Sequence, residues 1–372
     1  MFQKKIMASD NLLYAMALQH ASLIGDITAK KLISYCGTPE AVFKEKSSRL
    51  LKIDGIGTTI VSQLKRSDDL KAAEAELAFM DKTGIKGLYF ADDNYPNYLK
   101  HCLDGPLVLF VKGKSDFKSR RPVAIVGTRK ITAHGASFCK SLVEGLAIAN
   151  VAIVSGLAFG ADIIAHKVAL ENDMETIACL GHGLHRIYPH QHTHIAHSVE
   201  KHGALVSELW STTNFTSKHF VRRNRLIAGL SQATVVVESG AVGGSLITAE
   251  MALDYNRDVF AVAGRPSDRG SEGCNRLIMS QKAQMICSAE DLIYWMGWQP
   301  EEASKPIQKG LFLDLTDMEL KLYNCLKEAG KEHLDQLALN CKMTTHQAAG
   351  SLVQLELKGA IRPLPGKMFE VI

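Results

Sequence analysis

The sequence lacks several features that define large classes of proteins. Its eight cysteines are scattered along 372 residues, and no two of them form a C-x-x-C pair. Some lie in apolar segments such as residues 176–180, where a reduced, buried thiol is the ordinary interpretation. There is no run of about 20 apolar residues, and the amino terminus lacks the cleavage site of a signal peptide. We therefore expect a cytoplasmic protein with reduced thiols and no membrane partner.

Strong charge of one sign and the common nucleotide-binding signatures are also missing. The formal net charge is only +4, which permits an anionic partner without requiring one. The absence of G-x-x-x-x-G-K-[S/T] argues against nucleotide hydrolysis, and no G-x-G-x-x-G follows the first predicted strand of the sheet. Carboxylates are not clustered as a metal-dependent nuclease requires.

The hydrophobic content and the length of the sequence indicate a folded chain of more than one domain. Hydrophobic residues make up 46% of the sequence, and 372 residues exceed the size of one ordinary domain. Residues 1–85 have apolar residues at helical spacing. Within them, Gly55 and Gly57 separate two short helical patterns. They form either the phosphate-approaching turn of a helix-hairpin-helix (SAM-like) module or a plain capped turn, and both readings remain open.

Residues 86–298 alternate short strands with helices. Six segments are β-branched and almost wholly apolar, as expected of parallel strands that are covered on both faces. They are residues 123–126, 151–154, 176–180, 204–207, 234–238 and 259–263. The helical stretches between them predict a doubly wound, Rossmann-like α/β sheet.

The carboxyl-terminal part reads as a linker followed by a small domain. Residues 299–312 contain two prolines and mixed charges, which indicates a linker. Residues 313–372 contain three helical patterns and a β-hairpin pattern, and together these predict a winged-helix domain. Lys358 is the only Lys or Arg of the third helix, so a protein-docking or structural role is at least as well supported as DNA reading.

Three glycine-containing loops follow predicted strands of the sheet. They contain Gly127, Thr128 and Arg129; Ser155, Gly156 and Phe159; and Gly243, Gly244 and Ser245. Glycine lets backbone amides approach a ligand closely, and the helix that follows adds its positive amino-terminal end. Because the carboxyl ends of parallel strands share one edge of the sheet, the loops predict a phosphate-binding pocket.

Residues 214–231 combine cations with aromatic side chains and contain no acidic residue. The segment includes Lys218, Phe220, Arg222, Arg223, Asn224 and Arg225. Cations that neutralise phosphates beside aromatic rings that stack on bases are typical of single-strand binding. The alternative is an amphipathic helix decorated with arginines, and a helix that buries one face while presenting its first turn satisfies both.

Several motifs in this part of the chain follow one another in a fixed order. They are Gly127-Thr-Arg, Ser155-Gly-Leu-Ala-Phe-Gly-Ala-Asp162, Ile187-Tyr-Pro189, Arg223-Asn-Arg-Leu-Ile-Ala-Gly-Leu230, Gly244-Ser-Leu-Ile-Thr-Ala249 and Asn275-Arg-Leu-Ile278. Over residues 105–290 they resemble the signature segments of the DNA-processing protein A (DprA/Smf) family.

The resemblance implies a non-catalytic protein of natural transformation that uses no metal and no cofactor. Such proteins bind and protect incoming single-stranded DNA as homodimers and hand it to the RecA recombinase. Arg129 is then the phosphate-binding arginine, and Phe220 takes the place of a base-contacting aromatic beside Arg222, Arg223 and Asn224. Phe159, where the family often has a basic residue, would add a second stacking surface.

The same resemblance places a dimer interface around Leu277, Ile278 and Met285. Two like patches of this kind would close a two-fold dimer and set two pockets along one strand.

An enzyme is the alternative function, namely a nucleotide phosphoribohydrolase of the lysine-decarboxylase-like (LOG) superfamily. Residues 243–250 partly match that family's Pro-Gly-Gly-x-Gly-Thr-x-x-Glu loop, but Leu246 and Ile247 replace its glycine and threonine. Seven histidines between residues 182 and 202 favour exposed polar positions over a metal site. Asp162 and His166, four apart on one helix, predict a structural pair.

Overall fold

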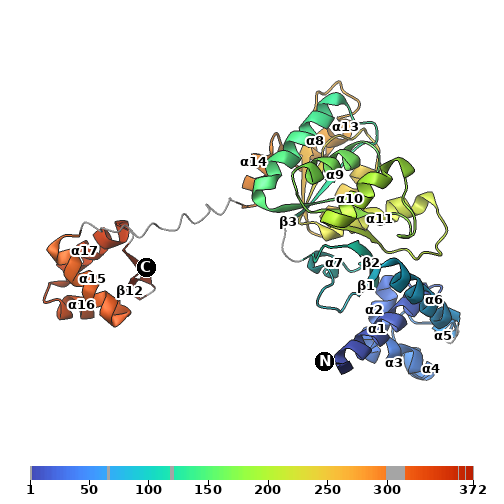
Figure 1. The fold of residues 1–372 in the computed structure, drawn as a ribbon, viewed down its shortest axis with the longest axis horizontal. Helices are drawn as coiled ribbons and strands as arrows, with labels where there is room; N and C mark the ends of the chain where they lie inside the picture. The colour runs from blue at the N-terminus through green and yellow to red at the C-terminus, as the bar shows by residue number, and fades with distance from the viewer. Residues whose placement is uncertain are drawn as a thin grey trace. The chain divides into compact units, whose positions relative to one another are not determined.

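The computed structural model describes residues 2–64, 68–117, 121–298, 315–358, 360–364 and 366–371. They belong to two compact units, Met1–Pro300 and Glu301–Ile372 (Figure 1). The predicted linker, residues 299–312, lies outside the described residues, and the predicted domain boundaries stay predictions. Among the described helices, none has the length and apolar character needed to cross a membrane.

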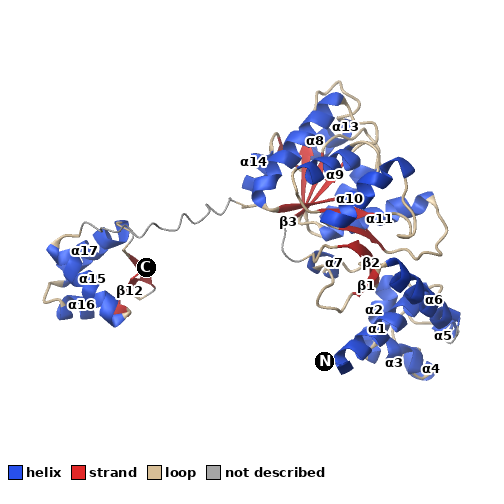
Figure 2. Cartoon of the chain, viewed as in Figure 1, coloured by secondary structure: helices blue, strands red, loops and turns tan. Residues whose placement is uncertain are grey.

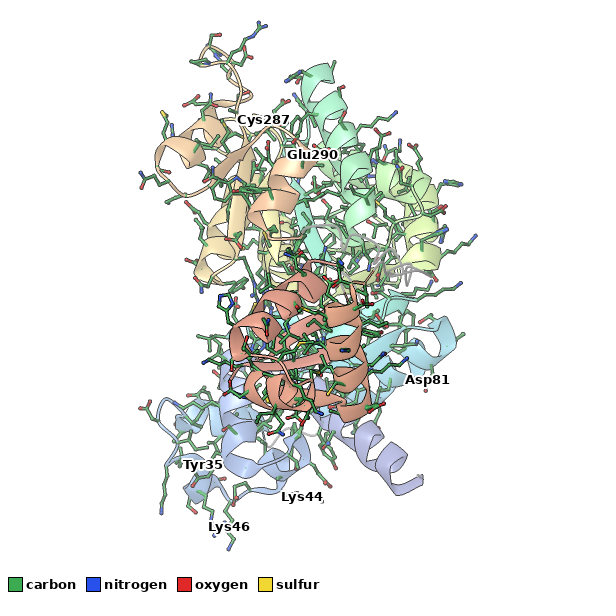
Figure 3. All side chains as sticks on the ribbon, turned by 90° about the vertical axis from the view of Figure 1, so that its left-hand side faces the viewer. Tyr35, Lys44, Lys46, Asp81, Cys287 and Glu290 are labelled. Carbon is green, nitrogen blue, oxygen red and sulfur yellow. The ribbon has the colours of Figure 1, made fainter. Side chains whose placement is uncertain are left out.

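The amino-terminal part is helical, as its apolar spacing predicts. Its helices are α1 (Phe2–His20), α2 (Asp26–Cys36), α3 (Pro39–Lys44), α4 (Ser47–Leu50), α5 (Thr58–Leu64) and α6 (Asp68–Thr83). Leu18 and Leu32 are fully buried between them, whereas Tyr35 and Lys46 point outwards (Figure 3). Gly55, with φ of +78°, lies in the turn before α5, where a residue with a Cβ would be strained.

A nine-stranded sheet forms the centre of the first unit (Figure 2). Its strands are β1 (Lys86–Tyr89), β2 (Val108–Gly113), β3 (Arg121–Val126), β4 (Val151–Ser155), β5 (Thr176–Cys179), β6 (Ala204–Ser207), β7 (Ala233–Val236), β8 (Asp258–Val262) and β9 (Gln284–Ile286). The spatial order is β1-β2-β6-β5-β4-β3-β7-β8-β9, and the strands from β6 to β9 in this order are parallel. The predicted doubly wound sheet is confirmed.

The strand order reverses where β3 meets β7. From β3 the chain moves outwards through β4 and β5 to β6, and then returns to place β7, β8 and β9 on the other side. Val123 on β3 is in register with Ala233 on β7, so both strands end at the same edge. Doubly wound sheets bind their ligands at such a point, outside the carboxyl ends of the strands.

Helices cover both faces of the sheet, which explains why its strands are apolar throughout. The helices of this part are α7 (Asn97–Lys100), α8 (Ala133–Leu146), α9 (Ala161–Glu171), α10 (Thr193–His202), α11 (Ser217–Leu230), α12 (Gly244–Asp254), α13 (Glu272–Met279) and α14 (Ala289–Trp295), with 3-10 turns η1 (Ala147–Ala149) and η2 (His190–His192). Val123 and Ile125 pack under α8, α9 and α14, whereas Ala124 and Val126 pack under α11 and α12. Alternate residues of one strand thus enter two different cores.

The sheet is wider than the six predicted strands. β2 pairs antiparallel with both β1 and β6 and so extends one side of the sheet. β9, only three residues long, pairs parallel with β8 at the opposite edge. A strand of three residues such as β9 carries too little pattern to be distinguished from a loop, whereas the apolar run of β2 was present in the sequence and was missed.

The second unit has the predicted winged-helix elements. They are α15 (Asp317–Ala329), β10 (Lys331–His333), α16 (Leu334–Asn340), α17 (Thr345–Leu357), β11 (Ile361–Leu364) and β12 (Met368–Val371). The strands form an antiparallel sheet of order β10-β12-β11. Leu322, Leu337, Leu352 and Leu355 are fully buried in its core.

Candidate nucleic-acid interface

A cavity of about 270 Å³ lies at the point where the strand order reverses. Nine of the predicted site residues line it: Gly127, Thr128, Arg129, Phe220, Arg223, Asn224, Gly243, Gly244 and Ser245. Five other predicted site residues are not among the described residues that line the cavity: Ser155, Gly156, Phe159, Lys218 and Arg222. The glycine loops after β3 and β7 and the first half of α11 therefore do converge.

The loop after β3 is fixed to the neighbouring strand. The Thr128 amide donates to the Glu238 carbonyl at 2.7 Å, and the Thr132 side chain caps α8 by accepting from the Gly135 amide. Arg129 is exposed on the cavity wall and forms no ion pair with the described residues. Its charge is therefore available to an anion.

The loop after β7 leads directly into α12. Gly243 and Gly244 are exposed on the cavity wall, and α12 begins at Gly244. Asn224 donates from Nδ2 to the Gly244 carbonyl at 3.1 Å, and Ser245 Oγ lies 2.9 Å from Ser239 Oγ. Because the first amides of a helix have no partner within it, this end of α12 favours an anion.

The loop after β4 supports the cavity from behind rather than from its wall. Ser155 is fully buried, and its Oγ donates to the Ile125 carbonyl at 2.6 Å. Arg223, only 5% exposed, donates from Nη1 to the carbonyls of Gly156 and Cys179. A Cβ at Gly156 would collide with this guanidinium. The contacts of Ser155, Gly156 and Arg223 thus hold this loop in place, and their predicted part in DNA binding stays a prediction.

A buried carboxylate balances the charge of Arg223. Asp162 accepts hydrogen bonds from the amides of Gly156 at 3.1 Å and Ala158 at 3.3 Å. Burial raises the pKa of Asp162, and Arg223 opposes this shift. Burial likewise lowers the pKa of Arg223, and Asp162 opposes that. Each charge thus offsets part of the cost of burying the other.

His166 has a different partner from the one predicted. Its Nδ1 lies 2.7 Å from Thr176 Oγ1, whereas Asp162 is occupied by backbone amides. The predicted Asp162–His166 pair is therefore wrong. The side chains face different elements although they are one turn apart on α9.

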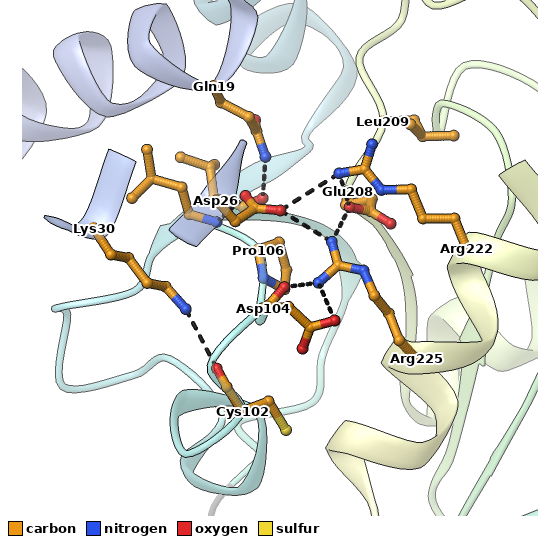
Figure 4. A network of polar contacts seen from close by, with 12 residues as sticks. Gln19, Asp26, Lys30, Cys102, Asp104, Pro106, Glu208, Leu209, Arg222 and Arg225 are labelled. Carbon is orange, nitrogen blue, oxygen red and sulfur yellow. Dashed lines mark hydrogen bonds and ion pairs between the residues drawn. The ribbon is translucent and has the colours of Figure 1, made fainter. Parts of the chain in front are cut away.

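Arg222 and Arg225 lie against the amino-terminal helices (Figure 4). Arg225 Nη2 pairs with Asp26 Oδ2 at 3.1 Å and with Glu208, and its Nη1 donates to the Asp104 carbonyl. Arg222 Nη2 lies 2.8 Å from Glu208 Oε2. Burial raises the pKa of Glu208, and the two arginines oppose this shift. Arg222 is thus engaged by carboxylates, unlike the free cation that the sequence suggested.

An aromatic cluster adjoins the cavity through Phe220. The Phe220 ring centroid lies 5.3 Å from that of Phe215 and 5.7 Å from that of Tyr188. Tyr188 is 51% exposed and Phe215 is 40% exposed, and the Arg186 guanidinium lies 5.4 Å from the Phe215 centroid. We call Tyr188, Phe215 and Phe220 the aromatic cluster.

Sequence reasoning missed two members of the aromatic cluster. The signal was present, since Tyr188 belongs to one signature segment and Phe215 precedes the cations of α11. Phe159, by contrast, is exposed outside the cavity wall and packs edge-on against His192, with 4.7 Å between the centroids. Lys218 is exposed in the first turn of α11.

The histidines between residues 182 and 202 serve separate local contacts. The Tyr188 amide donates to His182 Nε2 at 3.2 Å, and His192 Nδ1 lies 2.8 Å from the Leu157 carbonyl oxygen. Across the described ranges, no three side chains of metal-ligand type come together.

The predicted dimer residues divide between core and surface. Leu277 is only 6% exposed and belongs to the core under α11 and α12, so its side chain is not free for a partner. Ile278 is half-buried, whereas Met285 on the edge strand β9 is 45% exposed and Met279 is 78% exposed. Leu277 is thus corrected to a core residue, and Met279 joins the candidate surface.

These features define a class of protein. Around one cavity, where its strand order reverses, a doubly wound α/β sheet carries glycine loops, a helix amino terminus and an arginine without an ion pair among the described residues. This is the arrangement of an α/β protein that binds a phosphate-containing ligand.

Comparison with known proteins gives the family. Residues 86–297 match the family model for DNA recombination-mediator protein A, and residues 313–367 match that for the DprA winged helix domain. The chain is 34% identical to Protein Smf of Escherichia coli over 303 residues, which are 80% of each protein. It is 36% identical to the DNA processing protein DprA of Bacillus subtilis over 249 residues, 63% of this chain and 84% of that one.

Two solved structures of DNA processing protein A are also similar to this chain. The X-ray structure of DprA from Streptococcus pneumoniae matches with a TM-score of 0.63 and 31% identity over 76% of this chain and 97% of that one. The DNA processing protein A of Helicobacter pylori matches with a TM-score of 0.52 and 28% identity over 57% of this chain and 95% of that one. The protein therefore belongs to the DNA recombination-mediator protein A family.

Proposed function

We propose that this protein binds single-stranded DNA in the cavity between β3, β7 and α11, protects it, and passes it to a RecA recombinase during natural transformation. The observation that carries this proposal is the convergence at one cavity of Arg129, the exposed glycines at the start of α12, and Phe220, which joins the aromatic cluster to the wall. Phosphate-binding and base-stacking groups lie side by side, as a single strand requires.

The chemistry favours a single strand over a duplex. The rings of the aromatic cluster stack on a base only when that base is out of a helical stack, and every base offers such a face. Arg129 and the α12 amides meet the backbone, which is the same at every nucleotide. Binding is therefore tolerant of sequence at these contacts and sensitive to salt.

The relatives support this proposal. The structure of the Helicobacter pylori protein is described in terms of a unique single-stranded DNA binding mode, and the family model is named for a recombination mediator. Transfer of the strand to RecA is the role that such a name implies.

We propose further that the cavity performs no catalysis. Its buried carboxylate, Asp162, is occupied by two backbone amides and is balanced by Arg223. Leu246 and Ile247 lie in the first turns of α12, where the LOG-type hydrolases have the glycine and threonine of their nucleotide loop. The contacts that such an enzyme needs are therefore replaced by apolar side chains.

The protein is proposed to act as a homodimer in the cytoplasm. Ile278, Met279 and Met285 offer apolar surface beside the edge strand β9, and a two-fold dimer would set two cavities along one strand. All eight cysteines are free thiols, as suits a reducing compartment.

Fluorescence anisotropy with labelled single-stranded and duplex oligonucleotides tests the proposal. We expect tighter binding of the single strand and an affinity that falls steeply as the salt concentration rises. Equal binding of both DNA forms would contradict it. Hydrolysis of AMP by the purified protein would instead support the LOG-type enzyme.

A further inference from the structure

A second cavity lies beside the first at the same edge of the sheet. It has a volume of about 740 Å³ and is lined by residues of the α8 amino terminus and of the segment after β8. The two cavities share the chain that leaves β7, because Glu238 lines the second and Ser239 and Gly240 line the first. Likewise Arg129 lines the first and Thr132 the second. The loop between Arg129 and Thr132 thus separates two neighbouring pockets.

A buried carboxylate lies in the wall of the second cavity. Glu238 is only 6% exposed, and its Oε2 accepts from the Thr132 hydroxyl at 2.7 Å. Among the described residues, the Thr132 amide lies 3.2 Å from Oε2 and makes a longer contact of 3.3 Å with Oε1. A Cβ at Gly270 would lie 3.0 Å from this Oε1 and cover it. Glycine at this position therefore leaves an acceptor oxygen open, although the carboxylate is largely withdrawn from water.

Aromatic side chains line the same cavity. His134 and Phe138 are four residues apart on α8, so they lie on one side of the helix, and both line the wall. The rings of His134 and Phe138 and the Glu238 carboxylate thus line one cavity. Such a combination of stacking surface and acceptor suits a heteroaromatic base that carries N–H donors.

The charges in the wall distinguish a base from a phosphate. Glu238 and Asp268 supply two carboxylates, and Arg265 supplies one cation. A phosphate placed among the carboxylates is repelled, whereas the first cavity has Arg129 and the amino terminus of α12 for that purpose. The two pockets are therefore complementary to different parts of a nucleotide strand.

We propose that the second cavity is a nucleobase subsite, in which Glu238 accepts hydrogen bonds from a guanine of the bound strand. Guanine carries a ring N–H and an amino group side by side on one edge, and this edge offers its donors to Oε1, since Oε2 already accepts from Thr132. This inference rests on the proposed binding of single-stranded DNA in the first cavity. It adds a base preference to binding that is otherwise tolerant of sequence.

The test compares three oligonucleotides of equal length, about 15 nucleotides, which is comparable with the site sizes of other single-strand-binding folds. One contains only thymidine, one has guanosine at every third position, and one has inosine at those positions. Inosine keeps the ring N–H and lacks the amino group. We expect the wild-type protein to bind the guanosine strand about tenfold tighter than the thymidine strand, with inosine between them.

Two variants assign the preference to Glu238. Glu238→Gln keeps an acceptor for Thr132 but loses the negative charge, and Gly270→Ala covers Oε1 without altering the carboxylate. Both are expected to reduce the guanosine preference while leaving thymidine binding within about twofold of wild type. Gly350→Ala is the matched control, because a Cβ there meets no described atom within 4 Å beyond its own turn of α17. If Glu238→Gln fails to fold, Gly270→Ala alone decides whether the guanosine preference depends on the Glu238 carboxylate.

The results separate the two proposals. Equal affinity of the wild-type protein for all three strands overturns the guanine subsite and leaves single-strand binding intact. A guanosine preference that survives in both variants also overturns it. Failure to bind any strand contradicts the proposed function itself, and the subsite with it.

Discussion

Arg129 and Arg223 have the same chemistry in the sequence and opposite environments in the structure. Arg129 is exposed on the cavity wall, whereas Arg223 is buried and donates to the carbonyls of Gly156 and Cys179. The partners of Arg223 are the end of β5, 44 residues away in sequence, and the loop after β4, 67 residues away. A local pattern of cations therefore cannot show which of them is free to meet a phosphate.

At the residue scale, Phe220 is the aromatic side chain that joins the cluster to the cavity wall. We expect Phe220→Ala to weaken single-strand binding about 5- to 150-fold, since stacking on one base contributes about 1–3 kcal/mol. Phe159→Ala is the comparison, because that ring is exposed outside the cavity wall. Anisotropy titrations that show equal losses in both variants would contradict the assignment of the base to Phe220.

The buried His166 leads to a prediction about how the free energy of unfolding depends on pH. Burial, with smaller contributions from Arg223 and His192, lowers the pKa of His166 from 6.5 to about 3. In the unfolded chain the imidazole takes up a proton near pH 6.5, so acid favours unfolding. The contribution of neutral His166 to the free energy of unfolding is complete above pH 6.5. It is lost as the pH falls towards 3, by up to about 1.4 kcal/mol per pH unit.

Urea unfolding between pH 7.5 and pH 5 measures this effect. His166→Gln should be less stable than wild type at pH 7.5, because the Thr176 contact is altered, but its stability should fall less steeply with acid. His197→Gln, at a side chain that is 62% exposed, should keep the wild-type slope. An unchanged slope in His166→Gln would show that other groups dominate the acid response.

At the scale of one element, α11 serves three purposes along its length. Its first turns present Phe220 to the cavity, its arginines contact the loop after β4 and the amino-terminal helices, and Leu226 and Ile227 enter the core under the sheet. The two sequence interpretations of this segment, cationic site and amphipathic helix, are therefore both represented. Neither predicted the network with Asp26 and Glu208, because those carboxylates come from other parts of the chain.

This network predicts unequal effects for two neighbouring arginines. Arg225→Met leaves Glu208 and Asp26 largely buried without their central cation, and we expect it to lower the free energy of unfolding by about 3–5 kcal/mol. Arg222→Ala is the matched control, because its side chain is 51% exposed and such pairs contribute about 0–1 kcal/mol. Urea unfolding that shows equal losses would mean that the network does not depend on Arg225.

At the scale of the whole molecule, the sequence was sufficient for the central sheet and insufficient for its margins. The apolar runs that became β3 to β8 are buried on both faces, so their composition alone identified them. β1 and β9 form the two edges of the sheet and are short, whereas β2 was not predicted although its apolar pattern was present in the sequence. The glycine loops were predictable because parallel strands end together, whereas the second cavity was not, since Glu238 and Gly270 meet only in the fold.

The dimer surface is testable at the same scale. Met279→Glu and Ile278→Glu place a charge on the apolar surface beside β9, and we expect both to give monomers in light scattering. Ile148→Glu is the control, because Ile148 is 70% exposed on η1, outside that surface. Dimers that persist in both interface variants would place the interface elsewhere.

The most direct test of the central claim is the affinity of Arg129→Ala for single-stranded DNA. Loss of one charged contact should weaken binding about 10- to 100-fold and should lessen the dependence on salt. Lys140→Ala, which removes an exposed cation that pairs with Glu144 on α8, should bind like wild type. Anisotropy titrations with that outcome would assign the strand to the cavity at β3 and β7. Wild-type affinity in Arg129→Ala would contradict the account, because the DNA would then bind elsewhere on the protein.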